Sequence, residues 1–140
     1  MKNLILVTLL LLSSSVFAKE FRDRNEIRKF ADTFMEQIIQ ENFQKAFDIA
    51  KPSWPIPTVE IDNLVNTIKT QWPIVSSRFG KPIEMEFIRN ERIGKSFLRY
   101  YYLHKFNKHA IYWQIDFYRP NKSWVINSIS FQDKLNVLYK

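Results

Sequence analysis

Cysteine is absent from this sequence of 140 residues, and glycine occurs only twice. Without cysteine the chain can form no disulfide, zinc finger or iron–sulfur cluster, and it has no thiol nucleophile. With two glycines it cannot build the glycine-rich loop that holds phosphate in nucleotide-binding proteins. What the chain does contain is apolar, with 46% hydrophobic and 16% aromatic residues. That composition is typical of a folded protein, and the length fits a single domain.

The charge of the chain is basic, with 21 Lys and Arg against 14 Asp and Glu, which gives +7 at pH 7. The cations are dispersed, and no stretch holds five in a row. We therefore expect a solvated cationic surface that attracts polyanions over a long range, without a nucleic-acid site. Outside the cytosol, the partners of such a surface are anionic envelope polymers, lipid head groups and acidic proteins.

The first eighteen residues have the pattern of a secretory signal peptide. Lys2 is followed by an apolar run over 4–12 and three serines, and Ala18 supplies the small residue of a cleavage site. The run is shorter than the roughly 20 apolar residues that span a bilayer. We predict cleavage after Ala18, secretion to the bacterial periplasm, and one mature domain over 19–140. The alternative is an uncleaved anchor helix.

Helical periodicity predicts three helices in the first half of the mature chain. Asp23 can cap the first, with a carboxylate three residues later reaching back, and Asn42 can cap a short second one. Prolines at 52, 55 and 57 end the second helix and predict a stiff extended loop. Pro73 predicts a kink in the third helix, and Gly80 marks its end. The apolar stripes are Ile27, Phe30, Ala31, Phe34 and Ile38; Phe43, Ala46, Phe47 and Ala50; and Ile61, Leu64, Val65, Ile68, Trp72, Val75 and Phe79.

After Pro82 the apolar residues alternate with a period of two, which predicts four strands. A two-residue turn at 107–108 would place opposite one another the residues whose numbers sum to 215. That register gives one apolar face and one face on which Arg99 meets Asp116. In the fourth strand the apolar residues switch faces part-way along, and a bulge near Asn127 would place them on the same face. The predicted strands are 83–93, 96–106, 109–118 and 123–131, followed by a short tail.

We therefore predict an α+β domain in which three helices pack on one face of a strongly bent, four-stranded antiparallel sheet. This order resembles the NTF2-like (cystatin-like α+β) superfamily over roughly Phe21 to Leu138. The resemblance is carried by 71–82, from Gln-Trp-Pro to Phe-Gly-Lys-Pro, and by 124–131, from Trp-Val-Ile to Ser-Phe. These stretches are similar to small secreted bacterial members with no assigned activity.

The resemblance implies a cone whose helices close one end and whose concave sheet face lines a pocket at the other. The superfamily includes isomerases, dehydratases, ligand binders, transport factors and association domains, so the fold does not decide the function. Its domains often dimerise through the outer face of the sheet.

The face predicted to be concave offers a pocket for a small flat or hydrophobic ligand. Rings would hold the ligand, while tyrosine hydroxyls, a serine and a histidine would orient it. The alternative is a filled core whose tyrosine and histidine tips reach water or the backbone. The candidate ligand-binding residues are Trp72, Tyr100, Tyr102, His104, Trp113 and Ser128.

An isomerase or hydratase that uses His104 and a tyrosine is the alternative to simple binding. The register places no carboxylate base on the inner face, since Asp116 pairs with Arg99 outside, and nothing orients His104. Because His104 and His109 lack further ligands of matching spacing, we predict neither a metal nor a cofactor. The leading hypothesis is a non-catalytic domain that binds a small ligand or a protein partner. The two alternatives are the isomerase or hydratase described above and a basic module that contacts the envelope.

The outer face of the predicted sheet is unusually aromatic for a solvated surface, which indicates an interface. We expect a homodimer through this face, with the Arg99–Asp116 pair setting its register. The alternative is that the tyrosine rings lie flat among lysines and arginines. The candidate interface residues are Phe97, Arg99, Tyr101, Tyr112 and Asp116.

Overall fold

The computed structural model of the chain describes residues 19–139, so the predicted signal peptide lies outside the described residues. Three helices precede a four-stranded antiparallel sheet with the strand order β1-β2-β3-β4. This confirms the predicted α+β class and element order. The elements are α1 (Arg24–Ile39), α2 (Phe43–Ala50), η1 (Lys51–Ser53), α3 (Thr58–Phe79), β1 (Pro82–Ile93), β2 (Phe97–Phe106), β3 (Ala110–Tyr118), β4 (Val125–Gln132) and η2 (Leu135–Leu138).

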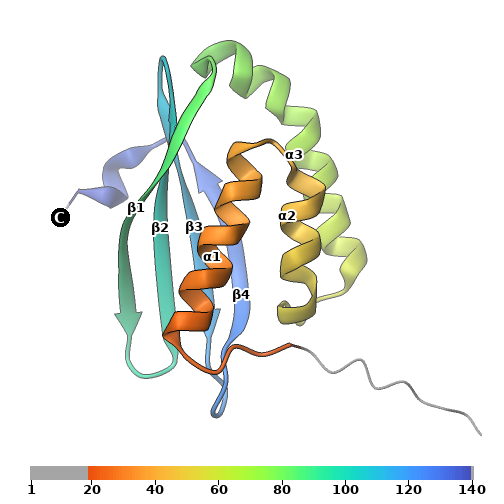
Figure 1. Cartoon of the computed structure of the whole chain (residues 1–140), viewed down its shortest axis with the longest axis vertical. Coiled ribbons are helices and arrows are strands. Elements are labelled where there is room, and N and C mark those ends of the chain that lie inside the picture. The colour runs from red at the N-terminus through yellow and green to blue at the C-terminus, as the bar shows by residue number, and fades with distance from the viewer. Residues whose placement is uncertain (1–18, 140) are drawn as a thin grey trace, which may run out of the picture.

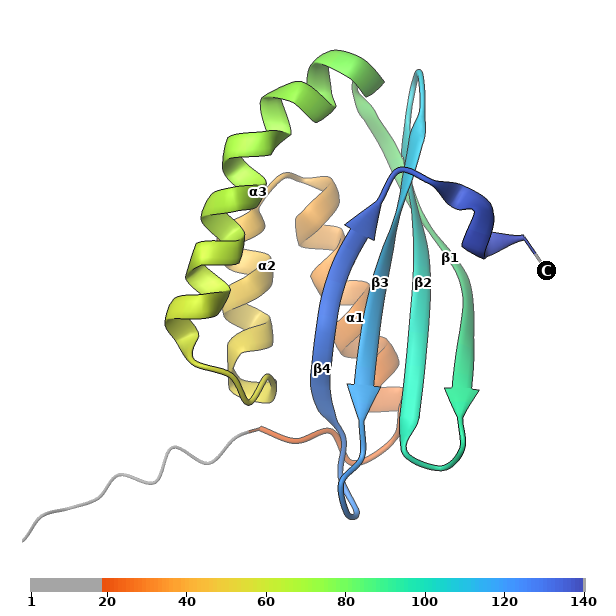
Figure 2. The ribbon, with the colours of Figure 1, turned by 180° about the vertical axis from the view of Figure 1, so that it is seen from behind.

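All three helices lie on one face of the sheet, and α1 packs against β1 and β2 (Figure 1). Viewed from behind, the sheet lies in front of α1, while α2 and α3 stand beside β4, and the chain after β4 crosses to the side of β1 (Figure 2). Both views show strands that curve gently, so the strong bend that we expected is not confirmed. Within the described part of the chain, no helix combines the length and apolar character needed to cross a membrane.

The first helix begins as its sequence predicts. The side chain of Asp23 accepts a hydrogen bond from the Glu26 backbone N–H at 3.0 Å. The Glu26 carboxylate reaches back and accepts from the Arg22 N–H at 2.8 Å, one residue earlier than in a regular capping box. The predicted stripe of α1 is buried in the core, together with Met35.

The second helix and the loop after it differ from the prediction. Asn42 precedes α2, but its side chain makes no capping hydrogen bond. Its amide instead donates to Gln37 and Gln40, at 3.2 and 3.3 Å. Pro52 lies in the short 3₁₀-helix η1 rather than in an extended segment. Proline suits this place because the first turn of a helix needs no N–H from it.

The third helix continues through Pro73 and ends at Gly80, as expected. In Figure 2, α3 changes direction toward its end and leads into the start of β1. Gly80 has a φ of +85° and a ψ of −153°, a combination that is open essentially to glycine alone. A Cβ at Gly80 would also lie 1.8 Å from Oδ1 of Asn107, so the turn between α3 and β1 requires this glycine.

The predicted pairing of β2 with β3 is confirmed residue by residue, from Tyr102 opposite Trp113 to Arg99 opposite Asp116. The predicted bulge in β4 is present as well. Asp116 pairs with Ser128 while the next residue pairs with Ile126, which leaves Asn127 as the extra residue. The register therefore fixes which side chains of β2 and β3 face the helices.

Candidate functional site

The aromatic residues expected to line a pocket are packed together inside the core. Trp72 stacks on His104 with ring centroids 5.8 Å apart, and Phe106 stacks on the same histidine at 4.3 Å. The indole Nε1 of Trp113 donates to Nδ1 of His104 at 3.3 Å. His104 and Trp113 have no exposed surface at all. No water-sized space therefore touches these two side chains.

Burial sets the chemistry of His104. It lowers the pKa of the imidazole to about 4, because the charged form would lose its hydration. Nδ1 accepts from Trp113, so Nε2 carries the proton, and this buried nitrogen has no hydrogen-bond partner. In the described residues no carboxylate orients the ring. His104 is therefore a neutral core residue and lacks the partner that a general base requires.

Tyr102 is buried as well, and its hydroxyl donates to Oδ1 of Asp32 at 2.7 Å. Arg28 donates from Nε to both oxygens of the same carboxylate, at 2.8 and 2.9 Å. Burial raises the pKa of Tyr102, and the hydrogen bond to Asp32 raises it further. The phenol thus stays protonated and ties β2 to α1. Tyr100, which is also buried, contacts the rings of Phe87 and Phe117.

The structure differs from the expected pocket in two respects. Around Trp72, His104 and Trp113, side chains fill the space because rings from the helices meet the rings of the sheet, whereas Tyr102 lines a separate cleft of about 460 Å³ beside α1. Ser128 lies on the opposite face, where its Oγ donates to Asp116 at 3.1 Å. The bulge at Asn127 causes this change, since one extra residue shifts every following side chain to the other face.

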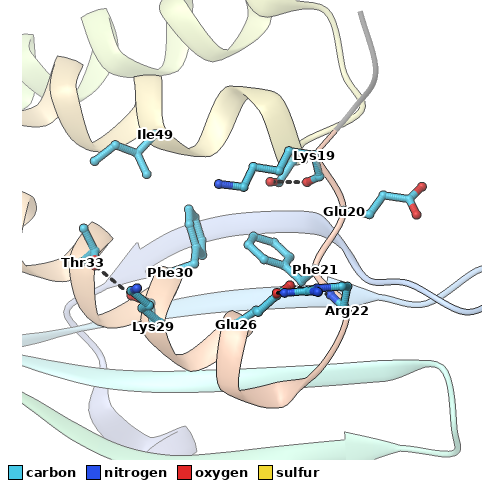
Figure 3. Close-up of a pocket in the computed structure, with 10 residues that line it drawn as sticks. Lys19, Glu20, Phe21, Arg22, Glu26, Lys29, Phe30, Thr33 and Ile49 are labelled. Carbon is cyan, nitrogen blue, oxygen red and sulfur yellow. Dashed lines mark hydrogen bonds and ion pairs between the residues drawn. The ribbon is translucent and has the colours of Figure 1, made fainter.

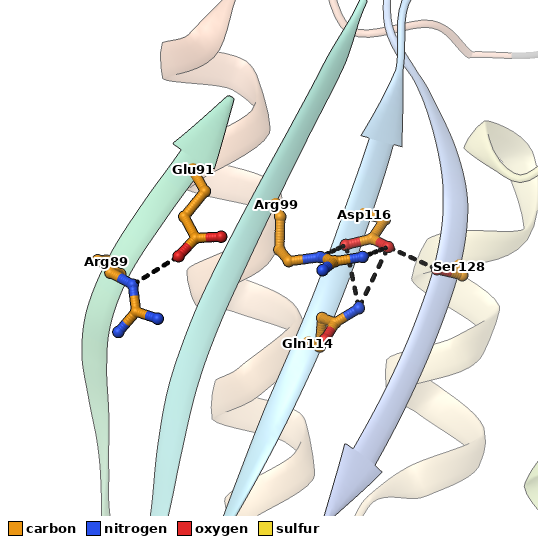
Figure 4. Close-up of polar contacts among 6 residues, drawn as sticks. All are labelled: Arg89, Glu91, Arg99, Gln114, Asp116 and Ser128. Atoms are coloured by element: carbon orange, nitrogen blue, oxygen red, sulfur yellow. Dashed lines mark hydrogen bonds and ion pairs between the residues drawn. The ribbon is translucent and has the colours of Figure 1, made fainter. Parts of the chain in front are cut away.

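The outer face of the sheet centres on the carboxylate of Asp116 (Figure 4). Arg99 donates to it through Nε and Nη2 at 2.8 and 2.9 Å, so the predicted pair is present and bidentate. The amide of Gln114 and the hydroxyl of Ser128 donate to the same carboxylate. The hydrogen bond to Asp116 raises the pKa of Arg99. The charges of this cluster are therefore satisfied within one chain.

The outer face exposes less aromatic surface than we expected. Tyr101 and Tyr112 are only 1% and 7% exposed. The guanidinium of Arg89 lies 4.7 Å from the centre of the Tyr101 ring and donates to the carbonyls of Val137 and Leu138 at 2.9 and 2.8 Å. The C-terminal segment is thus held beside Tyr101. The homodimer through Phe97, Arg99, Tyr101, Tyr112 and Asp116 stays a prediction, and the last three of these residues are already buried within one chain.

A cleft that the sequence did not reveal lies between residues 19–22, α1 and α2 (Figure 3). Its volume is about 470 Å³. Phe21, Phe30 and Ile49 give it an apolar surface, and the Lys19 side chain extends over that surface in Figure 3. The remaining lining residues are Glu20, Arg22, Glu26, Lys29, Thr33 and Ser53.

Backbone hydrogen bonds hold the first described residues in place beside this cleft. Phe21 exchanges two with Trp124, at 2.9 and 2.8 Å, and so adds a bridge next to β4. The backbone N of Lys19 donates to the carbonyl of Pro52 at 2.7 Å, and Oγ of Ser53 donates to the carbonyl of Lys19 at 2.5 Å. The cleft wall at residues 19–22 is therefore anchored to η1 at Lys19 and to the residue before β4 at Phe21.

The charges around the cleft are unevenly paired. Arg22 pairs with Glu26 at 2.5 Å, and this contact lowers the pKa of the Glu26 carboxyl. Among the described residues, neither Lys19 nor Lys29 has an ion-pair partner. The cleft thus combines an apolar surface with two free ammonium groups, which suits a ligand that is apolar at one end and anionic at the other.

No group of three or more His, Asp or Glu within residues 19–139 is arranged to hold a metal ion. No protein-family model matches the chain, and neither does any curated protein or solved structure.

Proposed function

We propose that this protein is a secreted, non-catalytic domain of the NTF2-like type that binds a small hydrophobic ligand carrying one anionic group. The ligand occupies the cleft between residues 19–22, α1 and α2. The observation that supports this most is the juxtaposition of the Phe21 and Phe30 rings with the unpaired ammonium groups of Lys19 and Lys29.

The size of the cleft agrees with this ligand class. A volume of about 470 Å³ falls within the roughly 300–1,000 Å³ of small-molecule sites. Burial of the ligand's apolar part against Phe21, Phe30 and Ile49 would supply most of the affinity, at roughly 25 cal/mol per Å² of apolar surface. The lysines would fix the orientation of the ligand. Its anionic group would lose hydration if it lay against the apolar surface of the cleft, so it lies at the ammonium groups instead.

The NTF2-like and secreted parts of the proposal rest on other observations. The order of three helices and a four-stranded antiparallel meander agrees with the superfamily. The charged start, apolar run and Ala18 of the first eighteen residues support secretion. The lack of a carboxylate partner for His104 in the described residues favours binding over an isomerase-type reaction.

Calorimetric titration with decanoate and with decanol tests the proposal. Decanoate should bind with a stoichiometry of one, and Lys29→Ala should weaken its binding several-fold while leaving decanol binding nearly unchanged. Lys45→Ala is the matched control, because Lys45 is an exposed lysine on α2 that does not line the cleft. Equal losses for both variants, or no decanoate binding at all, would refute the proposal.

A further inference from the structure

We infer that removal of residues 1–18 completes the cleft by placing the new α-amino group of Lys19 at its rim, so that the processed chain binds the anionic group more tightly than the unprocessed one. This inference rests on the proposed function, because it concerns how the same cleft recognises its ligand.

The position of the Lys19 nitrogen supports the inference. This atom donates to the carbonyl of Pro52 at 2.7 Å, and Ser53 holds the carbonyl of the same lysine at 2.5 Å. Both Lys19 and Ser53 line the cleft. The nitrogen is therefore fixed at the rim by contacts on either side of it, and it does not depend on a flexible side chain for its place.

Cleavage changes what this nitrogen can do. As part of a peptide bond it carries one hydrogen, which the Pro52 carbonyl takes. As a terminal ammonium it carries three hydrogens and a positive charge. One hydrogen still meets Pro52, and two are free to donate. An unperturbed α-amino group has a pKa of about 7.7–8.0, so it is mostly charged at neutral pH.

The other charged groups of the cleft decide how much this charge matters. Arg22 and Glu26 neutralise one another, while Glu20 carries one negative charge at the rim. The side chains of Lys19 and Lys29 supply two cations at the cleft. A third cation on a fixed backbone atom would therefore favour a carboxylate ligand, and its contribution would fall as the pH rises through about 8 and be lost by about pH 9. The titratable groups that line the cleft are Lys19, Glu20, Arg22, Glu26 and Lys29.

The first experiment determines where the chain starts after export. The full chain is expressed with its own N-terminus, exported, and its mature N-terminus is read by mass spectrometry. The inference requires Lys19 to be the first residue. Processing at another bond, or an uncleaved chain, would overturn it without affecting the cleft itself.

The second experiment compares the mature protein with the same protein acetylated selectively at its α-amino group. Acetylation keeps the one N–H that Pro52 accepts, so the fold is retained and equal thermal midpoints can confirm this. Decanoate should bind the acetylated protein about three- to tenfold more weakly at pH 6.5, and the difference should vanish by about pH 9. Decanol should bind both forms equally.

The outcomes separate the inference from the proposed function. Equal decanoate affinity for the free and acetylated forms at pH 6.5 would overturn the inference and leave the cleft as the binding site. Absence of decanoate binding to both forms would overturn the proposed function, and the inference with it. A loss of affinity that is the same for decanol would show a structural effect of acetylation and would also overturn the inference.

Discussion

The indole Nε1 of Trp72 donates a hydrogen bond of 2.9 Å to the carboxylate of Glu41, which has a φ of +60°. Glu41 follows the last turn of α1, at the position where helices commonly place a glycine in the left-handed conformation. A side chain is unfavourable there, yet this one satisfies a buried N–H of α3. The end of α1 is thus joined to the middle of α3 at the cost of local backbone strain.

This relationship predicts an effect of Glu41→Gly whose sign depends on Trp72. In the wild-type background the variant should lose about 1 kcal/mol of stability, because the lost charged hydrogen bond outweighs the relief of strain. In a Trp72→Phe background no indole N–H remains, so the same change should stabilise the protein by about 0.5–1 kcal/mol. Urea unfolding of the four proteins measures both effects. The same sign in both backgrounds would contradict the explanation.

The two glycines should differ sharply in their tolerance of alanine. Gly80→Ala places a Cβ 1.8 Å from Oδ1 of Asn107 and requires a conformation that alanine avoids. We expect a loss of about 3 kcal/mol or more. Gly94 has a φ of +55° and open space around its Cβ, so Gly94→Ala should cost only about 1 kcal/mol. Thermal unfolding of the two variants checks this order, and equal losses would show that the contact with Asn107 is unimportant.

The buried imidazole predicts how stability depends on pH. The pKa of His104 is lowered to about 4 in the folded protein, against an ordinary value of 6.5. Between these values the unfolded chain binds a proton and the folded chain does not. The contribution of His104 to the free energy of unfolding is therefore fully present above pH 6.5. It falls by on the order of 3 kcal/mol as the pH decreases toward 4.

Urea unfolding between pH 7 and pH 4 measures this loss. His104→Gln should flatten the profile, since glutamine does not titrate. His109→Gln should retain the wild-type slope, because His109 is exposed. A wild-type slope in the His104 variant would assign the acid sensitivity to other groups.

The outer-face cluster predicts that Asp116 stabilises the sheet. Asp116→Ala would leave Arg99, Gln114 and Ser128, which are half-buried, without their acceptor. We expect a loss of about 2 kcal/mol. The control is Glu84→Ala, which removes the carboxylate of an exposed pair with Lys105 and should have little effect.

Sedimentation of the wild type and of Asp116→Ala also tests the predicted homodimer, which should dissociate in the variant.

Some features followed directly from the sequence. The register of β2 and β3 was predictable because a two-residue turn fixes it, and a slip by one residue would have placed Arg99 inside. The apolar stripes of the helices were predictable because residues that recur with a period of 3.6 lie on one face of a helix, and that face packs against the sheet. In each case neighbouring residues along the chain determine the outcome.

Other features depend on distances between layers, which alternation does not specify. The pattern places Tyr102 and Trp113 on the inner face, but whether they enclose a cavity depends on the helix side chains opposite. Phe34 contacts Trp113 with centroids 6.2 Å apart, and Trp72 covers His104, so the space is filled. The cleft at residues 19–22 was missed for a related reason. It joins residues 19–22 to Ile49 and Ser53, which share no periodic signal with them.

The location of decanoate on the protein, read from NMR chemical-shift changes of the assigned side chains, decides whether the ligand site is where we place it. We predict changes at Phe21, Phe30 and Ile49, with the buried pair His104 and Trp113 unaffected. Changes centred on His104 and Trp113 would mean that the ring cluster opens to admit the ligand, and the proposed cleft would then be wrong.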